Sequence, residues 1–249
     1  LTIALSGKGG VGKTFISSML VKRISEHGSV MAIDADPDSN LPQALGVNVK
    51  RSVGQSREDI INAPMRSPVT NDKQGHLEQA IHASIEDFPQ FNIIVMGRSE
   101  GEGCYCAVNH VIRGVIDSRA RGYDYTVIDC HAGLEHLSRR TTRDVDIMLV
   151  VVEPTKNSVQ TAKRVMEIAR ELHIQFGAIY VGANRVTPEN RPRVDEQAKE
   201  NGIEITAYVP FDPIVGQYDG MGRPVSEIPR DSPAAKAVDG IVKKILSYA

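Results

Sequence analysis

The residues best suited to chemistry lie in a glycine-rich segment near the beginning of the chain, Gly7-Lys8-Gly9-Gly10-Val11-Gly12-Lys13-Thr14. This segment matches the pattern G-x-x-x-x-G-K-[ST] and stands between an apolar run and a stretch of helical period. Glycines allow the backbone to curl so that successive amide protons point at phosphate oxygens, and the N-terminus of the following helix adds positive potential. Lys13 is therefore expected to bind the β- and γ-phosphates of ATP, and Thr14 to ligate Mg²⁺.

Two acidic positions follow apolar runs that are expected to be strands. Asp129 comes directly after Tyr125-Thr126-Val127-Ile128, which is the arrangement of a carboxylate that holds the magnesium shell. Asp36 belongs to the acidic segment 34–40, at the end of the run 30–34, where ligands of α/β proteins bind. The alternative is that this segment only caps the helix expected over 41–45. Capping explains Asp38 and Ser39 better than it explains Asp36.

The pair Cys104 and Cys106, in the segment Gly101-Glu102-Gly103-Cys104-Tyr105-Cys106, is the second group of candidate ligands. Two thiolates are half of a closed site, which usually has four soft ligands, and such ligands suit zinc, nickel, copper(I) or iron. A two-fold axis past the pair would let two subunits share one ion. The alternative is two ordinary thiols in a surface loop. Cys130 stands alone at a strand end and is expected to be a buried small hydrophobe.

Short runs rich in Val and Ile alternate with longer segments of helical period, which predicts an α/β fold with a doubly wound, mostly parallel sheet covered by helices on both faces. The run Ile147 to Val152 is apolar on both faces, as a covered sheet requires. The expected strands are Thr2–Ser6, Val30–Asp34, Asn92–Met96, Tyr125–Asp129, Ile147–Val152, Gly177–Ala183 and Glu204–Val209. The expected helices are Lys13–Glu26, Asn109–Arg121, Ser158–Leu172, Pro188–Glu200 and Pro233–Tyr248.

Length and composition set limits on the function. The 249 residues predict one domain over 1–249, with a polar, peripheral helical excursion around 51–90. The 29 basic and 31 acidic residues nearly cancel, which disfavours a nucleic-acid partner. No apolar run reaches the length of a membrane span, so no stable membrane association is expected. Three cysteines, an odd number, favour a reducing, cytoplasmic location over a secreted disulfide framework.

The early lysine of the phosphate loop, Lys8, makes the loop resemble the deviant Walker A motif of the superfamily of MinD, ParA and the nitrogenase iron protein. The resemblance implies a P-loop ATPase fold like that of MinD and a homodimer in which Lys8 reaches the ATP of the partner. Lys8 and Lys13 would then both be catalytic, because their charges stabilise the transferring phosphoryl group. The other interpretation is that Lys8 only raises the local positive potential.

The same resemblance suggests roles for five further residues. Asp36 corresponds to switch I, where it would orient the attacking water or contact magnesium through water. Gly133 corresponds to switch II, where its amide would face the γ-phosphate. Asn184 matches the position that recognises adenine, and Pro210 and Phe211 match a second segment that contacts the base. An asparagine after a strand is also a common turn residue.

The phosphate loop, the Cys104–Cys106 pair and the string 133–139 together resemble the CooC family of accessory ATPases. These ATPases assist nickel insertion into carbon monoxide dehydrogenase, and relatives serve acetyl-CoA synthase. The resemblance implies a cytoplasmic homodimer that uses ATP, ADP and Mg²⁺ and binds Ni²⁺, or Zn²⁺, at Cys104 and Cys106. Two alternatives remain. One is a redox dimer bridged by an iron–sulfur cluster, and the other is a positioning ATPase like MinD or ParA.

A positioning ATPase would need a membrane-binding helix or a basic DNA-binding face. The C-terminal segment has apolar residues at helical spacing beside two lysines, which suits an interfacial helix as well as a core helix. We expect this stripe to pack on the sheet.

Overall fold

The computed structural model describes residues 1–61, 81–97, 122–131, 145–171 and 176–248, and the structural statements below concern these residues. Cys104, Cys106, Gly133 and the helix expected over 109–121 lie outside them. Within the described ranges, no helix is long and apolar enough to cross a membrane.

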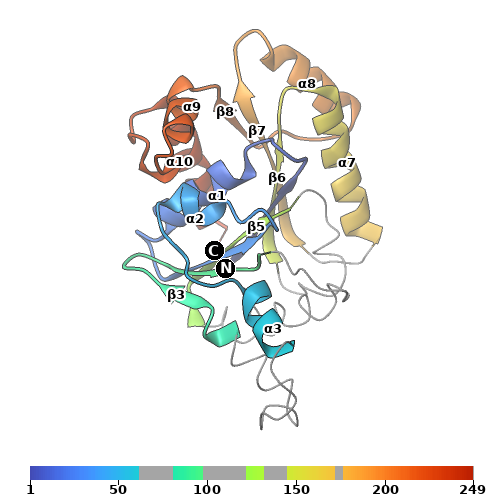
Figure 1. Ribbon diagram of the computed structural model, residues 1–249. Helices are drawn as coiled ribbons and strands as arrows, with labels where there is room; N and C mark the ends of the chain where they lie inside the picture. Colours follow the sequence, from blue (N-terminus) through green and yellow to red (C-terminus); the bar gives the residue numbers. More distant parts are fainter. Residues whose placement is uncertain (62–80, 98–121, 132–144, 172–175, 249) are drawn as a thin grey trace.

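The described residues form an eight-stranded sheet in the order β3-β4-β2-β5-β1-β6-β7-β8, parallel throughout except that β3 runs antiparallel to β4 (Figure 1). The fold is therefore the mostly parallel α/β architecture that the sequence predicts. The strands are β1 Thr2–Gly7, β2 Val30–Ala35, β3 Ile85–Asp87, β4 Asn92–Val95, β5 Tyr125–Cys130, β6 Val145–Val152, β7 Phe176–Val186 and β8 Ala207–Pro210.

Helices cover both faces of this sheet (Figure 1). One core cluster joins the sheet to α1, α2, α10 and the 3₁₀ helix η3, and a second joins it to α3, α7 and α8. The helices are α1 Lys13–Ile24, α2 Leu41–Leu45, α3 Val53–Ile61, α7 Lys156–Glu171, α8 Arg191–Glu200, α9 Pro213–Gly220, η3 Val225–Glu227 and α10 Pro233–Leu246.

Helix α1 is the best buried helix of the fold. Apart from Thr14 and Lys22, every residue from Lys13 to Ile24 is buried. The helix lies against β5 on one side and against α2, η3 and α10 on the others. Because α1 begins at the last residues of the phosphate loop, this packing holds the loop in a constant position relative to the sheet.

The C-terminal helix α10 packs against the sheet, as predicted. Val238, Ile241, Val242 and Ile245 are all buried and belong to the same core cluster as α1. The apolar stripe of α10 is therefore core.

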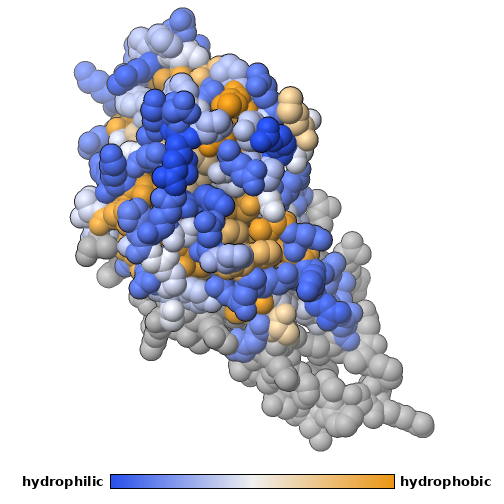
Figure 2. All heavy atoms as spheres, turned by 90° about the vertical axis from the view of Figure 1, so that its left-hand side faces the viewer, coloured by the Kyte–Doolittle hydropathy of each residue, from blue (hydrophilic) through white to orange (hydrophobic). Residues whose placement is uncertain are grey.

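Viewed from the side of α2 and α9, the surface is a mosaic of hydrophilic side chains with smaller hydrophobic areas between them (Figure 2).

The seven predicted strands are present, with small changes at their ends, but three elements were not predicted: β3, α9 and the short 3₁₀ helix η3. Strand β3 lies at the edge of the sheet, within the segment 51–90 that was expected to be a peripheral helical excursion. That expectation was therefore only partly right, because the segment contains a strand as well as helix α3. Helix α9 was missed because none of its residues is buried, so it has no core-facing period. Pro188 does not open α8, because Thr187 and Asn190 first form a turn in which the Thr187 amide donates to Asn190 Oδ1 at 2.9 Å.

We expect the substitution Leu20→Ala to lower the free energy of unfolding by roughly 2–5 kcal/mol, because it removes a fully buried side chain from the centre of α1. Urea denaturation followed by circular dichroism measures this change. Lys22→Ala, on the same helix, is the control and should change the value by less than about 0.5 kcal/mol. Equal effects of the two substitutions would contradict the central position of α1.

Candidate nucleotide site

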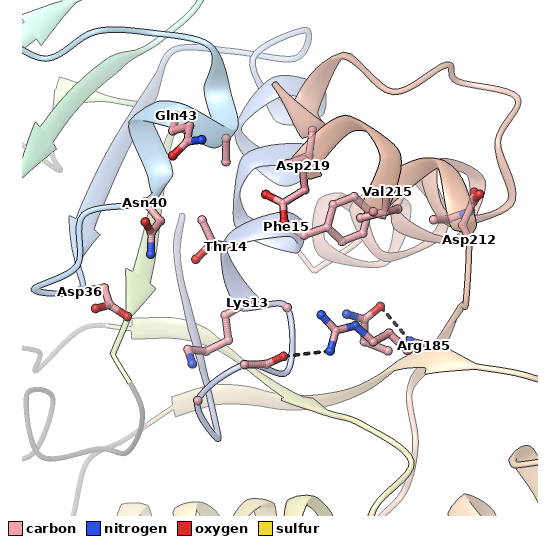
Figure 3. Close-up of a pocket in the computed structure, with 18 of the residues that line it drawn as sticks. Lys13, Thr14, Phe15, Asp36, Asn40, Gln43, Arg185, Asp212, Val215 and Asp219 are labelled. Atoms are coloured by element: carbon pink, nitrogen blue, oxygen red, sulfur yellow. Dashed lines mark hydrogen bonds between the residues drawn. The ribbon is translucent and has the colours of Figure 1, made fainter. Parts of the chain in front are cut away.

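A cavity of about 810 Å³ opens at the carboxyl ends of the parallel strands. The phosphate loop and the start of α1 form one wall, the loop after β2 forms another, and the ends of β7 and β8 with α9 form the third (Figure 3). This is the edge where ligands bind in open α/β sheets. Predicted site residues from four separate parts of the chain, Lys13, Asp36, Asn184 and Phe211, line the same cavity.

The phosphate loop curls because its glycines adopt conformations that other residues avoid. Gly7 has φ 142°, and a Cβ atom there would lie 2.3 Å from the carbonyl oxygen of Val151 on β6. Gly12 has φ 90° at the N-cap of α1, and a Cβ atom there would lie 2.3 Å from Nδ2 of Asn184. Glycine is therefore required at position 7 by the close approach of the β6 backbone, and it is favoured at position 12 by the positive φ.

The Lys13 side chain folds back over the loop. Its ammonium group donates to the carbonyl oxygens of Gly7 at 3.4 Å and Lys8 at 3.1 Å, and the residue is only 6% exposed. Burial lowers the pKa of Lys13, while Asp129 and Asp36 raise it. The lysine therefore sits where a polyanion would both replace its carbonyl partners and stabilise its charge. Lys8, in contrast, is exposed.

Asp129 is the second-last residue of the strand β5 and faces α1. Its Oδ1 accepts a hydrogen bond from the Ser17 hydroxyl at 3.0 Å, whereas the buried Oδ2 has no hydrogen-bond partner of ordinary length among the described residues. Burial raises the pKa of Asp129 to about 6, although the hydroxyls of Thr14 and Ser17 and the charge of Lys13 lower it. A magnesium shell needs oxygen donors of this kind. Asp129 Oδ2, the Thr14 hydroxyl and the half-buried Asp36 carboxylate fit that requirement.

Asp34 is a site residue that the sequence analysis did not single out. It lies opposite Asp129 in the register of β2 and β5 and is fully buried. Its carboxylate accepts hydrogen bonds from the amides of Asp36 at 3.1 Å and Leu41 at 3.0 Å. Burial and the neighbouring Asp129 raise its pKa to about 7. Asp34 therefore supports the acidic loop from below, while Asp36 lines the cavity.

The three residues expected to contact the base, Asn184, Pro210 and Phe211, also line the cavity. Pro210 is half-buried and Phe211 is 57% exposed, and both line the cavity. Asn184 is 3% exposed, and its Nδ2 donates to the carbonyl oxygen of Val11 in the phosphate loop at 2.9 Å. Arg185, which was not predicted, lies beside it at the same cavity (Figure 3).

Cys130 is the cysteine that lies within the described ranges. Cys130 is buried, as predicted, and its pKa is raised by burial and by the charge of Asp129, so it behaves as a small hydrophobe rather than a ligand. His131 lines the cavity beside it. The described residues contain no group of three or more His, Cys, Asp or Glu side chains that could hold a metal ion. Because Cys104 and Cys106 lie outside these residues, their role as ligands stays a prediction.

Comparisons with known proteins agree with this fold and with nucleotide binding. The profile of the CobQ/CobB/MinD/ParA nucleotide binding domain matches residues 2–225, and the chain therefore belongs to this family of nucleotide-binding proteins. An uncharacterized ATP-binding protein of Methanocaldococcus jannaschii is 42% identical over 99% of both chains.

Two more distant relatives are informative. The carbon monoxide dehydrogenase accessory protein CooC of Rhodospirillum rubrum is 28% identical over 89% of this chain and 88% of that protein. The MinD cell division protein of Aquifex aeolicus superimposes with a TM-score of 0.71 at 20% sequence identity, covering 99% of this chain and 96% of that one. The second likeness shows the shared fold alone.

The buried carboxyl of Asp34 predicts a pH-dependent stability for the protein without nucleotide or metal. Its folded pKa of about 7 lies above the ordinary 3.8, so the stabilising proton is fully bound below about pH 4 and is lost as the pH rises through about 7. We expect the free energy of unfolding to fall over this range. Asp34→Asn should make the fall shallower, because the amide cannot ionise. The raised pKa of Asp129 contributes in the same direction, so part of the pH dependence of stability should remain in the Asp34→Asn variant.

Urea denaturation in the presence of a chelator, at several pH values between 4 and 8, measures both profiles. The carboxamide introduced by Asp34→Asn can replace only one of the two acceptor oxygens, so the variant loses some stability at every pH. The slope, not the level, is therefore the quantity to compare. Parallel profiles for the two proteins would rule out Asp34 as a group with a raised pKa.

Proposed function

We propose that this protein hydrolyses ATP, with the phosphate loop binding the triphosphate. The observation that carries the proposal is that Lys13, Thr14 and Asp36 line one cavity at the end of the sheet, with the buried Asp129 interacting with all three from behind. Thr14 and Asp129 would hold Mg²⁺ directly or through water, and Asp36 through water. Bound Mg²⁺ neutralises charge on the β- and γ-phosphates.

In this proposal Asp36 orients the attacking water, and two lysines stabilise the charge of the transferring phosphoryl group. Lys13 acts within the subunit, where its ammonium group already contacts the carbonyl oxygens of the loop. Lys8 acts from the partner of a homodimer. Its exposure supports this role, because a buried side chain could not reach a second subunit.

Lys8→Ala should leave ATP binding nearly unchanged but lower the rate of hydrolysis by roughly 100-fold or more, because the lost charge acts only on the transition state. Phosphate release and ATP affinity are measured in parallel. Lys50→Ala, which removes an exposed lysine outside the cavity, is the matched control and should hydrolyse ATP at the wild-type rate.

Mixing two inactive variants tests whether Lys8 acts across the dimer. In a mixed dimer of Lys8→Ala and Asp36→Asn, the first subunit retains its own Asp36 and receives Lys8 from the second. Such a mixture should therefore hydrolyse ATP faster than either variant alone. Failure of the mixture to gain activity, while both variants still dimerise, would contradict action in trans.

We further propose that the protein handles a metal ion, with Cys104 and Cys106 of two subunits binding one Ni²⁺ or Zn²⁺ as cargo. The supporting observations are the Cys-x-Cys sequence and the 28% identity to the accessory protein CooC. The client is then a nickel enzyme such as carbon monoxide dehydrogenase or acetyl-CoA synthase. ADP would remain after each round of hydrolysis, and the protein would act in the cytoplasm.

The described part of the fold supports a link between the nucleotide site and the cysteine segment. Strand β4, after which the chain continues toward the cysteines, pairs with β2, and the Met96 amide donates to the Asp34 carbonyl oxygen at 2.9 Å. The Asp34 carboxylate in turn accepts from the amide of Asp36. Asp34 therefore connects the loop around Asp36 to the end of β4, and a change in that loop can act on β4 through it.

Anaerobic titration with Ni²⁺ and Zn²⁺, combined with sedimentation and performed with and without ATP, tests this proposal. We expect one ion per dimer, and loss of the ion in Cys104→Ser/Cys106→Ser while ATP binding survives. Cys130→Ala is the control, because this buried thiol should not affect the stoichiometry. A double variant that binds metal and dimerises as the wild type does would refute the metal-handling proposal and leave the ATPase.

The same preparations distinguish the two other candidates. An iron–sulfur redox protein would be brown and absorb visible light when purified anaerobically. A positioning ATPase, which the MinD and ParA members of the family support as a second candidate, would sediment with lipid vesicles or bind DNA. The stripe of α10 cannot supply a membrane contact in this fold, because its apolar side chains are buried.

A further inference from the structure

The end of strand β7 is irregular at the point where it meets the phosphate loop. Ala183 pairs with Tyr208 on β8, but Val186 pairs with Pro210, so β7 carries an extra residue between them. Arg185, inside this bulge, has φ 56°, which is unusual for a residue with a side chain. Bulges of this kind redirect side chains near functional sites.

The bulge turns two consecutive side chains toward the same loop. In a regular strand, neighbouring side chains point to opposite faces of the sheet. Here, however, Asn184 Nδ2 donates to the Val11 carbonyl oxygen at 2.9 Å, and Arg185 Nη1 donates to the Gly10 carbonyl oxygen at 3.0 Å. The Arg185 amide also donates to Asn184 Oδ1 at 2.9 Å, which orients the asparagine amide. Two successive carbonyls of the phosphate loop are thus held by two successive residues of β7.

Because the peptide unit is planar and trans, this contact also fixes the direction of an amide in the phosphate loop. The Gly10 carbonyl and the Val11 amide belong to one peptide unit, and they point in opposite directions. A hydrogen bond that draws the Gly10 oxygen toward β7 therefore turns the Val11 N–H away from β7. The contact of Asn184 with Val11 does the same for the amide of Gly12. Amides of this loop are the groups that bind the α- and β-phosphates in such sites.

We propose that Arg185 is a positioning residue for the phosphate loop, which together with Asn184 holds the Val11 and Gly12 amides in the phosphate-binding orientation before nucleotide arrives. This inference deepens the proposed function and rests on nucleotide binding by the loop. The Glu153 carboxylate, which follows β6, lies 3.7 Å from the same Nη1 atom that donates to Gly10 and forms an ion pair with the guanidinium group. The Asn190 side chain donates to the Arg185 carbonyl oxygen at 3.4 Å and supports the strained backbone.

The test compares three variants of the full chain. Arg185→Met keeps an unbranched apolar side chain but removes the guanidinium group, and Arg185→Gly also relieves the positive φ. Arg193→Met is the matched control, because Arg193 also donates to a backbone carbonyl, that of Pro154, but away from the phosphate loop. Isothermal titration with ADP gives the affinity, and steady-state ATP hydrolysis gives kcat and KM. Two-dimensional NMR reports the Val11 and Gly12 amide resonances in the nucleotide-free protein.

Both Arg185 variants should bind ADP about tenfold more weakly than the wild type, and their Val11 and Gly12 amide resonances should shift without nucleotide. KM for ATP should rise with kcat unchanged, because the loop amides bind the ground state and the transition state alike. Arg185→Gly should show this loss without losing thermal stability, which a merely structural role would not produce. Arg193→Met should match the wild type in every measurement.

Three results would overturn the inference. Wild-type ADP affinity in both Arg185 variants would show that the contact with Gly10 does not position the loop. A weaker affinity with unshifted Val11 and Gly12 resonances would make Arg185 a direct ligand of the nucleotide rather than a positioning residue. If the wild type itself fails to bind ADP, the proposed ATPase function fails first, and the inference falls with it.

Discussion

The curl of the phosphate loop at the end of β1 is the constraint on which the rest of the site depends. At Gly7 the chain passes so close to the Val151 carbonyl of β6 that no side chain fits, and Gly12 has a positive φ that a residue with a side chain rarely adopts. Since β1 lies between β5 and β6 and is parallel to both, the carboxyl ends of these two strands lie on either side of the loop. The buried helix α1 then holds the loop from below.

Burial is the main electrostatic influence on this site. It raises the pKa of Asp34 and Asp129 and lowers that of Lys13, because burial disfavours the charged form of each group. A divalent cation beside Asp129 would lower the pKa of that carboxyl group, and a polyphosphate beside Lys13 would raise the pKa of the lysine. Charged ligands of both signs therefore gain more here than they would at a solvated surface, because the low local dielectric strengthens each interaction. The pairing of β2 with β5 places these two carboxyl groups side by side, and burial strengthens the repulsion between their charged forms.

Much of this architecture follows from local sequence signals. Continuous apolar runs predict the parallel strands, because buried strands have no polar face, and the phosphate loop is recognised by glycines at required spacings. Strand β3 was missed because three residues are too few to show a period, and α9 because none of its side chains is buried. The acidic cluster after β2 was visible, but nothing in the sequence distinguishes the buried Asp34 from its more exposed neighbours.

By itself, then, the sequence determined the chemistry of the loop, the class of the fold and the candidate cysteine pair, because each depends on residue type and short spacing. Only the tertiary structure decided which distant residues meet. The register of β2 and β5 brings Asp34 beside Asp129, and the bulge in β7 directs Arg185 onto Gly10 across 175 residues of chain. Such contacts depend on how whole strands align and pack, and short-range sterics and hydrophobic period do not specify that alignment.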